Sequence, residues 1–402
     1  MRKIDYPEDI QALKTEYLAI FNNHLGRMQE DWENLRDELR GKDNNTEESH
    51  RLYPDHISEI LVADYELLVD IFVDYQDMVE VFGDGMENLN GALGRLFNYC
   101  TDDGTPPKFQ PAISNFFMRH QKELKLDVCY YCELSYINSY GFSSVYTDIG
   151  EFLMGATRHQ IERYVRRESG KKLAKRKYDK IMELRQMSGV TVSNIEDRFN
   201  YLDARWRDIP KKSEKVAGEL RNHFDLDHFL PKGKCPLVAL SLMNFVPSCP
   251  VCNEKLKGED ILWGENEANR RNVLLKVSPN SSGYDLDSAA KLRLDDHGHG
   301  WLRAQEHPQD YTLEFKSSDP DYQSEIIDEF HLDERYAYHK CEALRWHDLM
   351  NDYPPPRIKE MATALNGYKT EEQLRNDIFQ NEYFEKYVRC FDKLRRDILG
   401  IS

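Results

Sequence analysis

Two Cys-x-x-Cys pairs, Cys129/Cys132 and Cys249/Cys252, have the spacing of metal-binding knuckles. Each pair can direct two thiolates at one ion, and four thiolates at about 2.3 Å form a closed tetrahedral zinc site that is structural rather than catalytic. The pairs are separated by 116 residues, so a whole insertion would hang from such a site. The alternative is that each pair consists of two ordinary buried thiols.

Further side chains that could do chemistry precede the second pair, in "HFDLDHFLPKGKCPLVALSLMNFVPSCPVCNEKLKG". Asp227 and His228 are adjacent, Asn244 follows His228 by 16 residues, and Asn253 follows Asn244 by 9. His228 is a natural general base, because an imidazole titrates near neutral pH. Asp227 can bind a hard cation through oxygen. Neighbouring side chains on a regular strand point to opposite faces, so Asp227 and His228 can serve one site only at a bent strand end.

The segment 222–258 resembles the HNH endonuclease family in the order and spacing of these residues and in the Cys-x-x-Cys-Asn-x-Lys run that ends at Lys255. The resemblance implies a ββα-metal finger that hydrolyses phosphodiester bonds. In such a finger His228 would activate water, and Asn244 would hydrogen-bond the backbone near His228 and so orient its ring. The resemblance does not extend to the first hundred residues.

A divalent cation is the second requirement of this chemistry, because it stabilises the anionic transition state and the leaving oxygen. The resemblance implies that Asp227 and Asn253 hold the cation. The family often has His at the position of Asn253, and loss of an imidazole removes the preference for softer ions, so Mg²⁺ or Mn²⁺ is expected. Lys255 would contact phosphate or pack along the helix.

The charge of the 402-residue chain is distributed unevenly. Its net charge of −17 argues against a protein that coats nucleic acid in general. Residues 61–110 contain ten acidic and two basic side chains, whereas 158–180 contain ten Lys/Arg and three acidic ones. Several cations along one helix in 158–180 would suit phosphate contacts, and the alternative is a solvated charged helix. The candidate contacts are Arg166, Arg167, Lys171, Lys172, Lys175 and Arg176.

Apolar periodicity and turn signals indicate a mainly α fold with a small α+β finger. We expect an acidic helical region at 1–110 and the nuclease core at 111–260, with a basic helical insertion at about 133–221. Turns and strands followed by C-terminal helices are expected at 261–402. No apolar run approaches the roughly 20 residues that span a bilayer, and residues 1–18 lack an apolar signal core, so we expect a cytoplasmic protein without membrane contact.

Two other motifs leave alternatives open. "DDHGHGW" (295–301) could be a metal cluster or a hairpin tip. "FHLDERYAYHKCEALRW" (330–346) places Arg335, His339 and Glu342 near one face of a single expected helix. This pattern is similar to HNH proteins that look like the nuclease subunits of Septu-type or retron-type ATPase–nuclease defence systems. The alternative is a buried amphipathic helix.

These features together predict a Mg²⁺- or Mn²⁺-dependent DNA endonuclease with a structural zinc ion, acting in bacterial anti-phage defence. An ATPase or another defence-system subunit is the expected partner, docked on the acidic N-terminal helices, and the chain could form oligomers. One alternative is a zinc-stabilised module that binds nucleic acid or protein and has lost activity. Another is an HNH enzyme that cleaves RNA.

Overall fold

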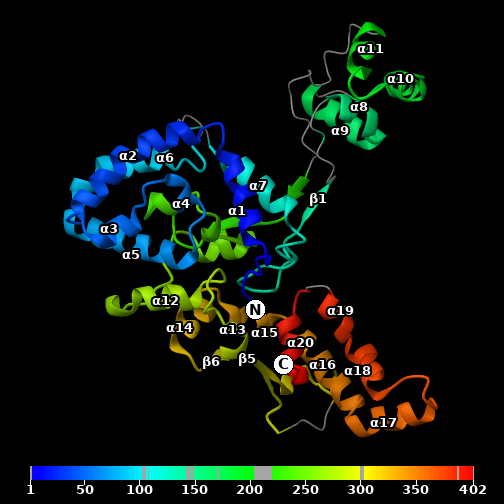
Figure 1. The fold of residues 1–402 in the computed structure, drawn as a ribbon. Helices are drawn as coiled ribbons and strands as arrows, with labels where there is room; N and C mark the ends of the chain where they lie inside the picture. The colour runs from blue at the N-terminus through cyan, green and yellow to red at the C-terminus, as the bar shows by residue number, and fades with distance from the viewer. Residues whose placement is uncertain are drawn as a thin grey trace. The chain divides into compact units, whose positions relative to one another are not determined.

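The computed structural model describes residues 2–101, 106, 108–141, 146, 149–169, 172–202, 220–298, 303–386 and 389–401. These residues are mainly helical, as expected, with three small two-stranded sheets (Figure 1). They form two compact units: Met1–Asn138 together with Asn222–Ser402, and Ser139–Arg221. None of the described helices is both long enough and apolar enough to cross a membrane.

The N-terminal part of the larger unit is a set of helices with clear local start and stop signals. The Thr46 side chain caps one of them by accepting a hydrogen bond from the Ser49 N–H at 3.1 Å. Another ends at Gly83, whose φ of 48° favours glycine. The helices are α1 (Ile10–Leu18), α2 (Leu25–Lys42), α3 (Glu47–Leu52), α4 (Ile57–Leu61), α5 (Tyr65–Phe82), α6 (Glu87–Leu96) and α7 (Gln110–Arg119).

These helices share one hydrophobic core with the segment 222–258. The Tyr17 hydroxyl donates to the Leu240 carbonyl at 2.8 Å, and both groups are buried. The Ser241 hydroxyl donates to the Ile60 carbonyl at 2.9 Å. The boundaries expected near residues 110 and 260 therefore fall inside a single packed unit.

A short hairpin and a helical segment form the centre of the larger unit. Strands β3 (Asp225–His228) and β4 (Phe245–Ser248) are antiparallel, and Asp227 lies opposite Val246. Pro250 then precedes a π-helix, η5 (Val251–Lys257), whose wide turn is closed by the Gly258 N–H donating to the Asn253 carbonyl at 2.9 Å. π-helical turns occur often at functional sites, because they re-aim side chains within a helix.

The C-terminal part of the larger unit combines a hairpin with further helices (Figure 1). Strands β5 (Ala290–Asp295) and β6 (Thr312–Ser317) are antiparallel; of the motif at 295–301, Asp295 ends β5 and 296–298 follow it, while 299–301 lie outside the described residues. The helices are α12 (Arg270–Val277), α13 (Leu286–Ala289), α14 (Pro320–Tyr322), α15 (Leu332–Tyr338), α16 (Lys340–Asp352), α17 (Pro355–Ala364), α18 (Glu371–Phe379), α19 (Asn381–Lys386) and α20 (Asp392–Leu399). A second π-helical segment, Gln323–Asp328, precedes α15.

The single helix expected through 330–346 is wrong, because the chain breaks between α15 and α16. His339 occupies the break, and its ring packs against Phe391 at 5.1 Å between ring centroids. Arg335 and Glu342 thus lie on different helices and do not share one helical face.

The smaller unit has its own hydrophobic core, which includes Phe152, Ile161 and Ile181. Strand β1 (Ser139–Gly141) pairs with β2 (Leu220–Asn222), and the helices are α8 (Ile149–Gly155), α9 (Arg158–Ser169), α10 (Lys175–Gln186) and α11 (Ile195–Leu202). The basic segment is therefore divided between α9 and α10, and the expectation of one continuous basic helix is wrong.

Candidate metal centre and active site

The four predicted cysteines come together in the larger unit. Their sulfur atoms lie within 4.8 Å of one another and all four residues are buried. An ideal tetrahedron of thiolates at about 2.3 Å has sulfur–sulfur separations of about 3.8 Å, so the cluster fits a zinc ion with little adjustment. Among the described residues, no other group of three His, Cys, Asp or Glu side chains has such geometry. The pairing across 116 residues is thus present in the fold.

His228 lies at the end of β3 with its imidazole fixed on three sides. Its Nε2 lies 3.0 Å from the Ala239 carbonyl, and because a carbonyl only accepts, Nε2–H is the donor. Tyr99 meets the ring edge-on at 4.6 Å, and Phe245 packs against it at 4.9 Å. Burial lowers the pKa of His228 to about 3, and the nearby Lys232 acts in the same direction. The ring is therefore neutral at pH 7, with Nδ1 carrying the free lone pair.

Asp227 is buried and already has two protein partners. The Tyr131 hydroxyl donates to its Oδ2 at 2.5 Å, and the Lys257 ammonium lies 3.2 Å from its Oδ1. Burial, with Asp227 close by, raises the pKa of Tyr131 well above its usual range, so the phenol keeps the proton that it donates. Lys257 also donates to the His228 carbonyl at 3.0 Å. Asp227 therefore holds β3, η5 and the first cysteine pair together.

Asn244 is completely buried and holds the loop that follows His228. Its side-chain oxygen accepts from the Leu230 N–H at 2.8 Å, and its amide donates to the carbonyls of Leu230 at 2.9 Å and Val238 at 3.0 Å. These bonds fix both ends of the turn that brings the Ala239 carbonyl to the His228 ring. Asn244 thus acts through backbone positions and makes no contact with the imidazole in these bonds.

Asn253 projects from η5 toward Asp225, two residues before Asp227 on β3. Burial raises the pKa of Asp225, and a hydrogen bond from Asn253 opposes that shift. The Oδ2 atom of Asp225 is buried without a hydrogen-bond partner. The Asn253 amide turns an N–H toward Asp225, so the Oδ2 atom of Asp225 is the carboxylate oxygen left open here, and carboxylate oxygens are the ligands that hard cations take.

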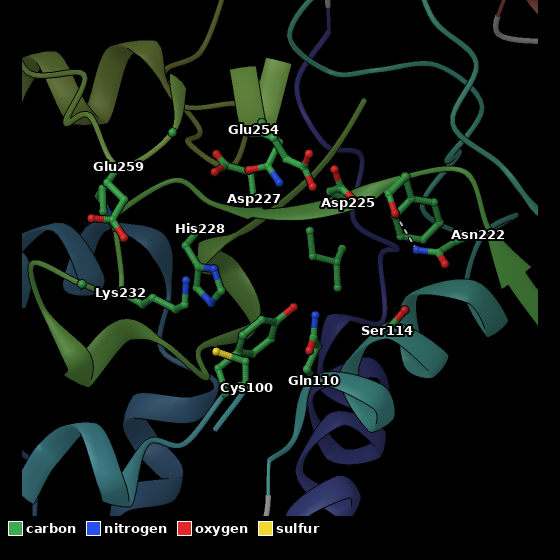
Figure 2. Close-up of a pocket in the computed structure, with 17 residues that line it drawn as sticks. Cys100, Gln110, Ser114, Asn222, Asp225, Asp227, His228, Lys232, Glu254 and Glu259 are labelled. Atoms are coloured by element: carbon green, nitrogen blue, oxygen red, sulfur yellow. Dashed lines mark hydrogen bonds between the residues drawn. The ribbon is translucent and has the colours of Figure 1, made fainter. Parts of the chain in front are cut away.

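A pocket of about 300 Å³ is lined by Asp225, Asp227, His228 and Asn253, whereas Asn244 is not among its lining residues. Figure 2 shows Asp225, Asp227 and Glu254 on one side of it, with Gln110 and Ser114 of α7 across from them. Lys232 and Glu259 lie at another edge, and Asn253 and Tyr99 also contribute to the lining. The pocket is rich in carboxylates, so an anionic substrate would enter it favourably only with a cation.

The candidate phosphate contacts do not belong to this pocket. Arg166, Lys172, Lys175 and Arg176 are exposed on the smaller unit. Arg167 belongs to α9 and Lys171 lies outside the described residues. Lys255 is exposed on η5 and does not line the pocket.

Four residues of this site were not recognised in the sequence. Asp225 could have been found, because residues i and i+2 of a strand share a face, and "DLD" places a second carboxylate beside Asp227. Tyr131 and Lys257 gave no such signal. A Tyr inside the first Cys-x-x-Cys pair and a Lys five residues after the second pair are both ordinary when each is considered alone. Tyr99 comes from the acidic helical region, which no local pattern connects to β3.

No family model matches the chain, and neither the curated proteins nor the solved structures contain a match. The functional conclusion therefore rests on the residues and their geometry.

Proposed function

We propose that this chain is a metal-dependent HNH-type endonuclease, with β3, β4 and η5 as its ββα-metal finger and a structural zinc ion held by the four cysteines. The observation that carries the proposal is the fixed His228 ring. Its Nε2–H is committed to the Ala239 carbonyl, so Nδ1 is left as the proton acceptor in a pocket lined by Asp225, Asp227 and Asn253.

In this proposal His228 takes a proton from water at Nδ1 as the water attacks phosphorus. The Ala239 carbonyl keeps the ring in the required tautomer, and Tyr99 and Phe245 limit its rotation. Asp227 and Asn253, with the orphaned oxygen of Asp225, would hold Mg²⁺ or Mn²⁺. The ion would neutralise the phosphate and the leaving oxygen.

The direct test compares wild type with His228→Ala on supercoiled plasmid, with Mg²⁺ or Mn²⁺ and with EDTA as control. Loss of a general base reduces the rate by about 10²–10⁴-fold, so cleavage by the variant should fall below detection. Circular dichroism and the zinc content of the variant should match wild type. If His228→Ala cleaved plasmid at the wild-type rate, His228 would not be the general base.

The competing class is a zinc-stabilised binding module without activity. The neutral, buried imidazole and the orphaned Asp225 oxygen belong to residues that line one pocket, and this favours the enzyme, because a binding surface gains nothing from an unsatisfied buried group. The same assay with single-stranded DNA and with RNA distinguishes a DNase from a ribonuclease. Binding without cleavage of any of these substrates would favour the module.

We also propose that the chain acts with a partner, such as the ATPase of an anti-phage system. The support is the acidic excess in residues 61–110, which leaves nucleic-acid contact to other surfaces. Co-expression with the neighbouring genes followed by size-exclusion chromatography tests this, and the cleavage assays should be repeated with any subunit that co-elutes. Elution of the chain alone in every combination would count against a stable partner.

A further inference from the structure

Helix α15 lies directly against the cysteine cluster. Arg335 donates from Nη1 to the Cys252 sulfur at 3.3 Å and to the Phe330 carbonyl at 3.1 Å. On the same helix, the buried Tyr336 hydroxyl donates to the Cys132 carbonyl at 2.8 Å. One short helix therefore contacts a cysteine from each of the two pairs, although it follows the second pair by some eighty residues.

The segment before α15 fixes the position of the guanidinium. The Phe330 ring stacks on Tyr131, between the first two cysteines, with centroids 4.5 Å apart and an interplanar angle of 17°. The Phe330 carbonyl that accepts from Arg335 thus belongs to a residue packed against the Cys129–Cys132 turn. The contact between Arg335 and Cys252 is accordingly held from two directions and does not depend on a freely rotating surface side chain.

The contact between Arg335 and Cys252 matters because a zinc site with four thiolates is negatively charged. A zinc ion bound by four thiolates carries a net charge of −2, and this site is buried, where an uncompensated charge is costly. Backbone N–H groups also donate to sulfur, from Cys249 to Cys129 at 3.3 Å and from Leu134 to Cys132 at 3.4 Å, but these donors are neutral. The Arg335 guanidinium brings both an N–H donor and a positive charge.

We propose that Arg335 is a working part of the zinc centre: its guanidinium offsets the charge of the four thiolates and shields Cys252 from protons and competing metal-binding agents. The inference rests on the proposed zinc ion and not on nuclease activity. Groups that hydrogen-bond metal ligands change metal affinity by about 10–100-fold when they are removed. Arg335 is accordingly a positioning and charge-compensating residue, with no role in the proposed hydrolysis.

The test measures zinc release from the full-length protein to an excess of a chromogenic chelator at pH 7.5. Arg335→Gln keeps an amide donor but removes the charge, and it should release zinc about tenfold faster or more. Arg335→Lys keeps the charge without the planar fork and should fall between Arg335→Gln and wild type. Arg345→Gln is the matched control, because Arg345 lies on the neighbouring helix α16 beside Trp346 and Glu342.

A second readout replaces zinc with cadmium and follows the ¹¹³Cd resonance, which senses hydrogen bonds to the thiolates. Arg335→Gln should shift this resonance and Arg345→Gln should leave it in place. Release rates within twofold of wild type for Arg335→Gln would overturn the proposal, as would equal acceleration by Arg335→Gln and Arg335→Lys. Wild-type protein that binds no zinc would instead refute the zinc centre itself, which keeps the two failures distinct.

Discussion

Asp227 is the residue on which the site depends most, because its two oxygens connect the first cysteine pair to the π-helix. Tyr131 reaches Oδ2 from the Cys129–Cys132 turn, and Lys257 reaches Oδ1 from η5. Both partners are fully buried, and Asp227 is 3% exposed. The position of the proposed cation ligand is therefore set by the same elements that hold the cysteines.

Removing the Tyr131 hydroxyl tests this connection. Tyr131→Phe leaves the Asp227 Oδ2 without its donor, so we expect a stability loss of about 1–3 kcal/mol and a fall in kcat of about tenfold with little change in KM. Tyr130→Phe is the matched control, since that buried hydroxyl donates to the Leu124 carbonyl at 2.6 Å. Unfolding in urea and plasmid cleavage are measured for both. A similar fall in kcat for the two variants would contradict a specific role for Tyr131.

The Lys257–Asp227 pair gives a prediction that is independent of activity. Lys257→Met leaves a buried carboxylate without its counter-charge and should destabilise the protein by about 3–5 kcal/mol. Adding Asp227→Asn should recover part of this loss, because the uncompensated charge disappears. In the control Lys14→Met, the partner Asp64 is 78% exposed, so a loss below about 1 kcal/mol is expected. Guanidinium unfolding is measured for wild type, Lys257→Met, the double variant and Lys14→Met. Equal losses of unfolding free energy in the two single Lys→Met variants would contradict the prediction.

At the scale of elements, short sequence patterns could indicate features that depend on neighbouring residues, but not those that depend on distant packing partners. Where the resemblance implied a ββα finger, the structure has the β3–β4 hairpin followed by the π-helical η5, within 225–257. The π-helical form of η5 and the break at His339 were missed, because both depend on packing partners far along the chain. Asp225 was visible in the alternation of β3, whereas the link from Tyr131 to Asp227 spans 96 residues and leaves no local trace.

The smaller unit should be removable without loss of the larger one. Its core is separate, and the chain ends that it connects lie together in the larger unit, where the His223 N–H donates to the Asn138 carbonyl at 2.9 Å. We expect a protein in which 139–221 is replaced by a short Gly-Ser linker to unfold cooperatively and to keep one zinc ion per chain. Elemental analysis and a urea titration measure both properties.

The same deletion separates the two interpretations of the basic helices. If α9 and α10 contact phosphate, DNA affinity falls and the dependence of log Kd on log salt becomes shallower by about 0.9 for each lost contact. If the exposed cations only solvate the helices, affinity and salt dependence remain those of wild type. Loss of zinc or of cooperative unfolding in the deletion protein would show that the larger unit needs the insertion to fold.

At the scale of the whole molecule, the acidic N-terminal helices share one core with the site and with α15 and α20, although composition suggested three regions, whereas α17 and α18 pack in a small cluster of their own. Composition shows only the local charge and the turn-forming residues of each region. The hydrogen bonds that join the N-terminal helices to the site connect residues more than two hundred positions apart, such as Tyr17 and Leu240. Helix α20 gives a second case. The Lys393 N–H donates to the Glu133 carboxylate, next to Cys132, at 3.2 Å.

The ion pairs that dock α20 give a prediction with a defined pH dependence. Arg396 donates to both oxygens of Asp287 at 2.6 and 2.8 Å, and Lys393 lies 3.5 Å from the same carboxylate. Burial acts to raise the pKa of Asp287, the hydrogen bonds from Arg396 and the charge of Lys393 act to lower it, and the pKa lies well below its ordinary value. Asp287→Asn should therefore cost about 1 kcal/mol at pH 7, allowing for the partial exposure of the pair.

Because the pKa of Asp287 is lowered in the folded state, the stability difference between wild type and Asp287→Asn should disappear at low pH. A carboxylate with a lowered pKa in the folded state contributes stability that is fully present above the unfolded-state pKa of about 3.9 and is lost as the pH falls further. Urea unfolding should thus give the same gap between wild type and Asp287→Asn from pH 7.5 to 5, and a narrowing gap below about pH 4. Asp84→Asn, at an exposed carboxylate, should show little difference from wild type across the range. A gap that widens on acidification would mean that Asp287 is not held as a carboxylate by α20.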